Sequence, residues 1–328
     1  MVFPVFWRGT TPPIRDDNGK ILSNSIASLE RVHIGGMPQW ILIRGAHIAN
    51  PVILFLHGGP GMPAMYLAHR FQRPLEKDFT VIQWDRRGAG KTFRKDTPPE
   101  SIRVTQEIAD AVSLVKLMGS RLEHSKVFLV GHSYGTYLGM ILANRFPELF
   151  HAYIGIGQLA YSEERNRELQ REWIQLQAKS SGDARLLRDL DAEAPIDYEE
   201  YLFKFGGALH NGRSFTPLLM AGLRAPEYSL KDVLNVRRGV VFTHKNMKYD
   251  AIKGDLIDEI RNLNIPVFFF TGRYDYVDPF QFTVEYANKL LAPKKETVWF
   301  ENSAHFPFFE EPEKFAGEMK RVARESQN

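Results

Sequence analysis

The chain has 328 residues, more than one domain usually contains, and this length suits one α/β domain with a sizeable insertion. Its 42 basic and 39 acidic residues are mixed along the chain, without the lysine or arginine run that would favour nucleic acid as a partner. The absence of cysteine excludes disulfide bonds, thiolate metal sites and a cysteine nucleophile.

The apolar amino-terminal segment, residues 1–7, does not resemble a targeting signal. It is shorter than the apolar core of a secretory signal, and no basic segment precedes it. Elsewhere no stretch reaches the roughly 18 apolar residues that a membrane-spanning helix needs. We therefore expect a cytoplasmic protein without a membrane partner.

Eight short runs rich in β-branched and aromatic residues predict strands. The first two are typical of an antiparallel hairpin at the edge of a sheet. Several later runs are almost continuously apolar, as in parallel strands that are covered on both faces. The predicted strands are residues 29–34, 40–43, 52–56, 80–84, 127–130, 153–156, 267–270 and 297–300.

Helical patterns alternate with these runs, at residues 104–117, 134–144, 280–290 and 313–323. The alternation of strand and helix predicts an α/β fold with a mostly parallel, doubly wound, eight-stranded sheet and right-handed crossovers.

Residues 161–262 break this alternation. They contain no convincing buried strand, and residues 163–193 are rich in charge, with Leu169, Trp173 and Leu176 at helical spacing. We interpret the segment as an inserted helical lid. Residues 1–160 then form the first part of the core and residues 263–328 form the second part.

The motif Gly131-His132-Ser133-Tyr134-Gly135 directly follows the predicted strand 127–130 and begins a helix. This context is typical of a nucleophile elbow, G-x-S-x-G, in which the glycines let the turn close and the serine hydroxyl projects above the sheet. A tight turn with a capping serine is the alternative. The strand, turn and helix order favours Ser133 as a nucleophile.

A second glycine-rich loop, His57-Gly58-Gly59-Pro60-Gly61, follows the predicted strand 52–56. Its glycines allow backbone N–H groups to approach a ligand closely. Taken alone, it could be a simple turn. Together with Ser133 it predicts an oxyanion hole, formed by the N–H groups of Gly59 and Tyr134.

The base and the orienting acid must follow the nucleophile in the order acid, then histidine. Among ten histidines, only His305 follows the last strand and an acidic loop. Asp275 lies closer to the end of strand 267–270 than Asp278, which precedes Pro279 and looks like a helix-start residue. We therefore predict nucleophilic acyl transfer by Ser133, with His305 as general base and Asp275 orienting it.

Two other chemistries find little support. Gly88-Ala-Gly90-Lys91-Thr92 ends like a phosphate-binding P-loop, but Asp85 stands where the first glycine is required. No H-E-x-x-H motif or other metal-ligand spacing occurs. We expect no metal and no cofactor.

The motifs in combination resemble the proline iminopeptidase branch of the α/β hydrolases. They are His57-Gly-Gly-Pro-Gly61, Trp84-Asp-Arg-Arg-Gly-Ala-Gly-Lys-Thr92, the serine elbow, Gly272-Arg-Tyr-Asp275 and His305. The resemblance spans the catalytic domain. It implies an α/β-hydrolase fold and release of an N-terminal residue, often proline, from short peptides or amides.

The chain departs from that branch at three places. Arg86 stands where the family usually has glutamine, and the elbow reads G-H-S-Y-G rather than G-G-S-W-G. The family's lid glutamates, which hold the substrate amine in a Trp-Glu context, have no counterpart here. The lid contains Glu163, Glu164, Glu199 and Glu200, but a solvated helix face explains these at least as well.

The leading hypothesis is therefore a serine aminopeptidase of the proline iminopeptidase type that acts on small-molecule or short-peptide substrates. A carboxylesterase acting on small esters is the alternative, because it would use the same mechanism. A non-catalytic protein that retains the fold is less favoured, because every catalytic role is filled. The sequence gives no indication of an oligomeric state.

Overall fold

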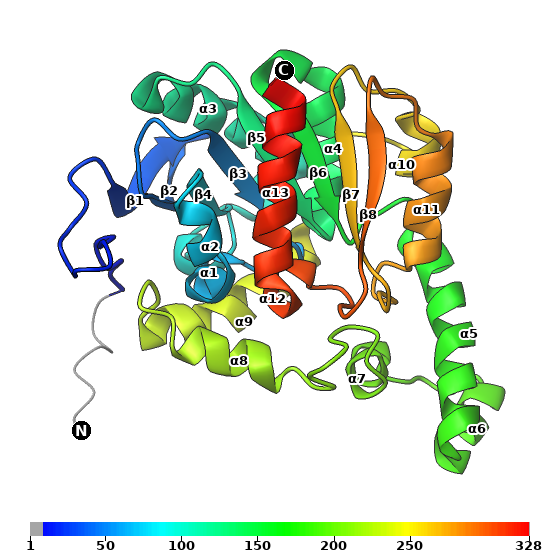
Figure 1. Ribbon diagram of the computed structural model, residues 1–328. Coiled ribbons are helices and arrows are strands. Elements are labelled where there is room, and N and C mark those ends of the chain that lie inside the picture. Colours follow the sequence, from blue (N-terminus) through cyan, green and yellow to red (C-terminus); the bar gives the residue numbers. More distant parts are fainter. Residues whose placement is uncertain (1–8, 328) are drawn as a thin grey trace.

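The computed structural model describes residues 9–327, so the apolar segment 1–7 lies outside the described residues. An eight-stranded sheet in the order β1-β2-β4-β3-β5-β6-β7-β8 forms the centre of the molecule (Figure 1). The strands are β1 (Ile26–Ile34), β2 (Met37–Gly45), β3 (Val52–Leu56), β4 (Thr80–Asp85), β5 (Val127–His132), β6 (Phe150–Ile156), β7 (Val267–Gly272) and β8 (Lys295–Phe300).

All eight predicted strands are present, and the sheet has the expected mixed character. β1 and β2 form an antiparallel hairpin, and β2 pairs antiparallel with β4. From β4 to β8 every neighbouring pair is parallel. The carboxyl ends of six strands therefore meet at one edge of the sheet, where ligands bind in open α/β sheets.

Helices cover both faces of the sheet, as the continuously apolar strands require. One face packs against α3, α4, α10 and α11, and the other packs against α1, α2, α12 and α13. These helices are α1 (Ala68–Phe71), α2 (Arg73–Glu76), α3 (Val104–Leu122), α4 (Tyr134–Arg145), α10 (Leu256–Glu259), α11 (Phe280–Lys289), α12 (Pro307–Glu310) and α13 (Pro312–Gln327).

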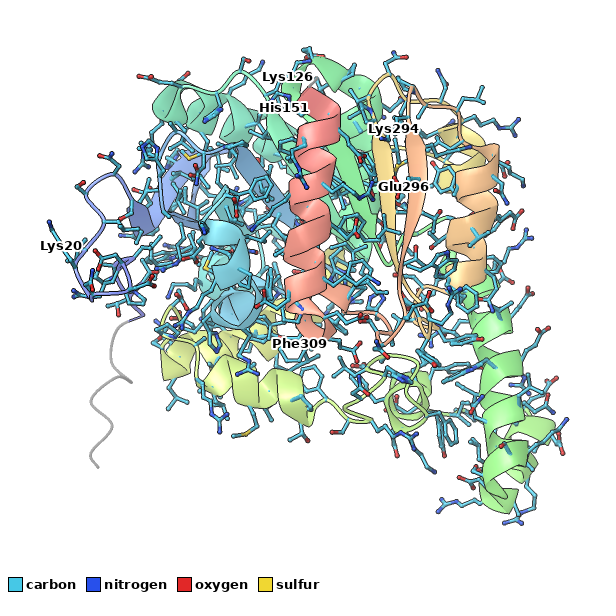
Figure 2. All side chains as sticks on the ribbon, in the orientation of Figure 1. Lys20, Lys126, His151, Lys294, Glu296 and Phe309 are labelled. Carbon is cyan, nitrogen blue, oxygen red and sulfur yellow. The ribbon has the colours of Figure 1, made fainter. Side chains whose placement is uncertain are left out.

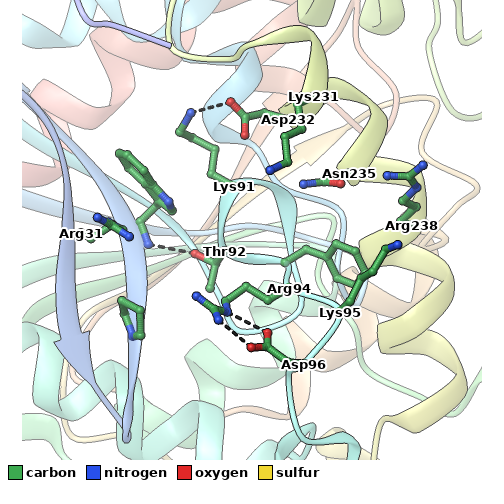
Figure 3. A pocket seen from close by; sticks show the side chains of 13 residues that line it. Arg31, Lys91, Thr92, Arg94, Lys95, Asp96, Lys231, Asp232, Asn235 and Arg238 are labelled. Atoms are coloured by element: carbon green, nitrogen blue, oxygen red, sulfur yellow. Dashed lines mark hydrogen bonds and ion pairs between the residues drawn. The ribbon is translucent and has the colours of Figure 1, made fainter. Parts of the chain in front are cut away.

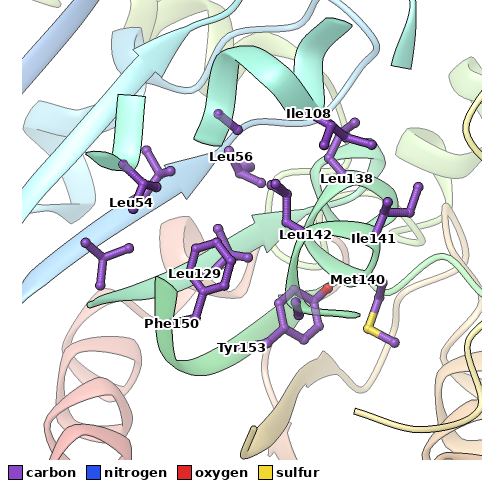
Figure 4. Packing of buried hydrophobic residues seen from close by; sticks show 14 of the residues in the cluster. Leu54, Leu56, Ile108, Leu129, Leu138, Met140, Ile141, Leu142, Phe150 and Tyr153 are labelled. Atoms are coloured by element: carbon purple, nitrogen blue, oxygen red, sulfur yellow. The ribbon is translucent and has the colours of Figure 1, made fainter. Parts of the chain in front are cut away.

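The strands send alternate side chains to these two layers. Leu54 and Leu129 face α3 and α4, where they pack with Ile108, Leu138 and Leu142 (Figure 4). The neighbouring residues of the same strands face α1, α2 and α13 instead. Burial on both sides fixes the register, because a shift by one residue would exchange the two faces.

The segment between β6 and β7, all of which is described, contains helices but no strand of the sheet. Helices α7 to α9 lie along the carboxyl edge of the sheet, and α5 and α6 project to one side of it (Figure 1). These helices are α5 (Glu163–Ser181), α6 (Ala184–Asp191), α7 (Tyr198–Lys204), α8 (Thr216–Leu223) and α9 (Leu230–Asn246). The short helix α10 also belongs to this segment and packs against the sheet. Short 3-10 turns complete the chain: η1 (Met65–Leu67), η2 (Gly90–Thr92), η3 (Pro99–Ser101) and η4 (Pro147–Leu149).

The two ends of the parallel strands can be located by labelled residues. Lys126 and His151 mark the edge where the parallel strands begin, whereas Phe309 lies near the edge where they end and faces the inserted helices (Figure 2).

Within residues 9–327, no helix is long and apolar enough to cross a membrane.

The apolar residues whose spacing predicts α5 are only partly buried in it. Leu169 and Trp173 are half-buried, whereas Leu176 is 62% exposed. The fully buried residues of the helix are Asn166, Gln170, Ile174 and Ala178. Two of these four side chains are polar, so the apolar pattern alone does not mark the buried positions.

Candidate active site

Ser133 occupies a tight turn between β5 and α4. Its backbone has φ 53° and ψ −123°, a strained conformation for a residue with a side chain. Neighbouring glycines make this turn possible, because a Cβ at Gly135 would overlap the carbonyl oxygen of Leu56 on β3. The turn places the Ser133 side chain at the carboxyl edge of the sheet, as the motif predicts.

His305 and Asp275 lie together next to this turn. The Nδ1 atom of His305 is 2.9 Å from Oδ2 of Asp275, and both side chains are buried. Asp275 Oδ1 accepts hydrogen bonds from the N–H groups of Val277 and Asp278, which fix the carboxylate at the end of β7. The structure thus brings together the predicted base and the predicted orienting acid.

Asp278 lies on the other side of the imidazole. The Ser133 hydroxyl donates a hydrogen bond to its Oδ2 at 3.2 Å, and the same oxygen is 3.8 Å from Nε2 of His305. Oδ1 accepts a hydrogen bond from the Asn166 amide at 3.4 Å. The interpretation of Asp278 as a helix-start residue is wrong: α11 begins at Phe280, and this carboxylate faces the candidate nucleophile instead.

Burial and charge shift the pKa values of these groups in defined directions. Burial raises the pKa of Asp278 to about 7, against the lowering effects of His305 and the Ser133 hydrogen bond. Burial alone would lower the pKa of His305, but the charge and hydrogen bond of Asp275, with the charge of Asp278, raise the net pKa above its ordinary value. Strongly shifted groups in a cleft are typical of functional sites.

The loop His57 to Gly61 lies beside Ser133, because β3 and β5 are adjacent and parallel. A Cβ added at Gly58 would lie 3.1 Å from Cβ of Ser133. The predicted oxyanion donors, the N–H groups of Gly59 and Tyr134, therefore belong to neighbouring loops at the same edge.

A buried cluster behind this loop escaped prediction from the sequence. The carbonyl oxygen of Gly58 accepts hydrogen bonds from His57 Nδ1 at 2.9 Å and from Arg86 Nη2 at 3.2 Å. Arg86 Nε lies 3.5 Å from Glu107, which also accepts a hydrogen bond from the hydroxyl of Tyr134. The cluster ties the glycine loop to the residue that follows Ser133.

The charges in this cluster are fully buried. Burial lowers the pKa of Arg86 and raises that of Glu107. The opposite charge of each side chain partly offsets the effect of burial on the pKa of the other. The arginine at position 86 is a recognisable departure in the sequence motif. The sequence does not indicate its partner Glu107, because this residue lies on α3 within an otherwise ordinary amphipathic pattern.

The inserted helices contact the loop that carries both aspartates. On α5, the Gln170 amide donates a hydrogen bond to the carbonyl of Val277 at 2.8 Å. The Trp173 ring stacks on Tyr276 with ring centroids 4.3 Å apart. These contacts couple the position of α5 to that of Asp278. By contrast, Glu163, Glu164, Glu199 and Glu200 are all exposed.

Lys91 and Thr92, the end of the P-loop-like sequence, serve a structural purpose. Lys91 Nζ pairs with Asp232 on α9 at 2.7 Å, and the Thr92 hydroxyl donates to the Asp85 carbonyl at 2.6 Å. They line a basic hollow of about 490 Å³ (Figure 3). Its other charged residues are Arg31, Arg94, Lys95, Asp96, Lys231 and Arg238. None of the three predicted catalytic residues lines it.

In the part of the chain that the structure describes, no group of three or more histidine, aspartate or glutamate side chains could hold a metal ion.

The chain is similar in sequence to known proteins of the fold described above. Residues 51–312 match the family model described as the alpha/beta hydrolase fold. A probable aminopeptidase of Bacillus subtilis, YbaC, is 31% identical over 309 residues, covering 92% of this chain and 97% of that protein. A proline iminopeptidase of Heyndrickxia coagulans is 26% identical, covering 81% of this chain and 88% of that protein.

Solved structures have the same architecture. The proline iminopeptidase of Mycobacterium smegmatis superposes with a TM-score of 0.65 at 18% sequence identity, covering 92% of this chain and 99% of that chain. At this identity the similarity concerns the fold. The sheet order, the strained serine turn and the family match together establish that the chain belongs to the α/β hydrolases.

Proposed function

We propose that this protein is a serine aminopeptidase that releases the N-terminal residue of short peptides or amides through an acyl-enzyme. The observation that carries the proposal is the similarity to the probable aminopeptidase YbaC over 92% of the chain, joined to the serine turn beside His305 and Asp275. Proline iminopeptidases among the relatives support the same substrate class.

In the proposed mechanism, the Ser133 hydroxyl transfers its proton to Nε2 of His305 and attacks the substrate carbonyl. Asp275 holds Nδ1–H of His305 and stabilises the imidazolium that forms. His305 then protonates the leaving amine. A water molecule, deprotonated by the same imidazole, releases the acyl group and restores Ser133.

The negative charge on the tetrahedral intermediate requires nearby donors. We assign this role to the N–H groups of Gly59 and Tyr134. Arg86 and His57 hold the carbonyl of Gly58 and so act as positioning residues for the glycine loop.

We propose further that residues 161–262 act as a lid over the two core segments 1–160 and 263–328. Contacts from α5 to Val277 and Tyr276 support this division, because they link the insertion directly to the loop that carries the acids. A segment that covers the site can exclude water and commit the bound substrate to reaction.

The carboxylesterase alternative is less favoured, because the relatives named above are aminopeptidases and iminopeptidases. Mass spectrometry of Pro-Ala-Ala, Ala-Ala-Ala and Leu-Ala-Ala digests tests the choice. We expect stepwise loss of the N-terminal residue and no digestion of the N-acetylated peptides. Hydrolysis of short acyl esters without any peptide cleavage would contradict the proposal and favour an esterase.

A further inference from the structure

We propose that Asp278 is the binding site for the protonated α-amine of the substrate. The inference rests on the aminopeptidase function proposed above and names the group that recognises its substrate. It follows from one unexpected contact, the hydrogen bond of 3.2 Å from the Ser133 hydroxyl to the Asp278 carboxylate.

The Asp278 carboxylate is buried without a permanent cation. Its side chain is 7% exposed, and its neighbours are Ser133, Asn166, Asp275 and His305. Among residues 9–327, no lysine or arginine forms an ion pair with it. Burying an ionised carboxylate costs several kcal/mol unless a positive charge compensates for it. A ligand cation can supply that charge.

The distances place a substrate ammonium within reach. In an N-terminal residue, the nitrogen lies about 2.5 Å from the carbonyl carbon, as the standard N–Cα and Cα–C bond lengths require. The Ser133 oxygen attacks that carbon, and Asp278 Oδ2 lies 3.2 Å from the Ser133 oxygen. A carboxylate so close to the nucleophile can pair with an ammonium on the α-carbon, including the secondary ammonium of proline.

Binding of the amine also frees the nucleophile. Without substrate, the Ser133 hydroxyl donates to Asp278, and no hydrogen bond joins it to His305 in the described structure. A substrate ammonium replaces the hydroxyl as donor to Asp278. The hydroxyl then turns to His305 Nε2, which lies 3.8 Å from the same carboxylate oxygen. Substrates with a blocked amine lack this effect and leave Asp278 unpaired.

The exposed glutamates of the insertion are poorer candidates, because water screens their charge. Asp278 is instead held from two sides. Its own N–H donates to Asp275, and its Oδ1 accepts a hydrogen bond from Asn166 on α5. A carboxylate fixed in this way distinguishes substrates by the charge and the position of their amine.

The test compares alanine p-nitroanilide with its N-acetyl form, and an alanine ester with its N-acetyl form, in wild type, Asp278→Asn and Asp278→Ala. We expect kcat/KM for the free-amine substrates to fall by about 100-fold in both variants, the usual size for loss of a buried charge partner. Activity on the acetylated ester, which lacks the ammonium, should fall much less than activity on the free-amine ester in both variants.

Asp258→Asn, an exposed aspartate paired with Arg261, is the matched control and should behave as wild type. Labelling of Ser133 by a fluorophosphonate verifies that each variant is folded and retains its nucleophile. A preference for free amines that survives in both Asp278 variants would overturn the inference while leaving the aminopeptidase function intact. A wild type without any preference for free amines would overturn both.

Discussion

The imidazole Nδ1 of His305 lies 2.9 Å from Asp275 Oδ2, and both groups are buried between β7 and the loop that follows β8. This pair fixes the tautomer in which Nε2 is free to accept the Ser133 proton. Asparagine at position 275 could present its NH₂ group to Nδ1 and would stabilise the wrong tautomer.

We therefore expect Asp275→Asn to lower kcat on the order of 10³-fold or more, with little change in KM. Steady-state kinetics on an anilide substrate measure the effect. Glu301→Gln changes an exposed acid on the neighbouring loop and serves as the control. A loss of less than about tenfold in Asp275→Asn would exclude this residue as the orienting acid.

The sequence predicts the sheet well and the site in part. Strand runs such as 52–56 and 267–270 are apolar throughout, because they are buried on both faces, and the serine turn needs glycines that are visible in the motif. These features leave a local signal. The contact between Asp278 and Ser133 has no local signal in the sequence, because it joins residues that are far apart in the chain.

Polar packing explains why the buried positions of α5 and the pair of Arg86 and Glu107 are not predicted from the sequence. On α5, Asn166 and Gln170 are buried because they donate hydrogen bonds to the Asp278 carboxylate and to the carbonyl of Val277, respectively, so the apolar pattern does not mark these positions. Glu107 is buried because Arg86 accompanies it. Pairing between distant polar residues is decided by tertiary structure and has no period in the sequence.

The pair Arg86 and Glu107 offers a stability prediction. We expect Arg86→Met to lower the free energy of unfolding by about 3 kcal/mol, because Glu107 would remain buried without its cation. Adding Glu107→Gln should restore part of the loss. Urea denaturation measures both variants. Arg94→Met, which breaks an exposed pair with Asp96, should leave stability nearly unchanged. Equal losses at both arginines would contradict the buried-pair account.

The pH dependence of stability tests the buried state of Asp278. Burial raises its pKa to about 7, whereas an aspartate in an unfolded chain has a pKa of about 3.9. Between these values the unfolded chain loses the proton while the folded protein keeps it, so the contribution of Asp278 to stability falls as pH rises.

Asp278→Asn removes this penalty. We expect its stability relative to wild type to grow from about pH 4 to about pH 7 and to reach on the order of 4 kcal/mol at higher pH. Denaturant titrations across this range provide the measurement. A difference that is independent of pH would mean that the carboxylate keeps an ordinary pKa in the folded protein.

The negative charge of Asp278 also acts on the proposed general base, His305. Although burial acts in the opposite direction, Asp275, Asp278 and Glu310 raise the pKa of His305 above its ordinary value. The imidazole must be neutral to accept a proton, so reactivity of Ser133 should fall as pH drops through this raised pKa. Removal of one negative charge in Asp278→Asn should move this acid limb to lower pH.

Fluorophosphonate labelling measured against pH follows the base without a titrating substrate amine. Glu301→Gln, which removes an exposed charge, should leave the midpoint where it is in wild type. A midpoint in Asp278→Asn that is unchanged or higher would show that this carboxylate does not act on His305.

The central claim is that Ser133 drives cleavage at a free N-terminal residue. Its most direct test is turnover of proline, alanine and leucine anilides by wild type and by Ser133→Ala, assayed side by side with short acyl esters. We predict anilide turnover in wild type that vanishes in Ser133→Ala, with the order of rates giving the residue preference. Anilide cleavage that persists in Ser133→Ala, or ester cleavage alone in wild type, would contradict the account.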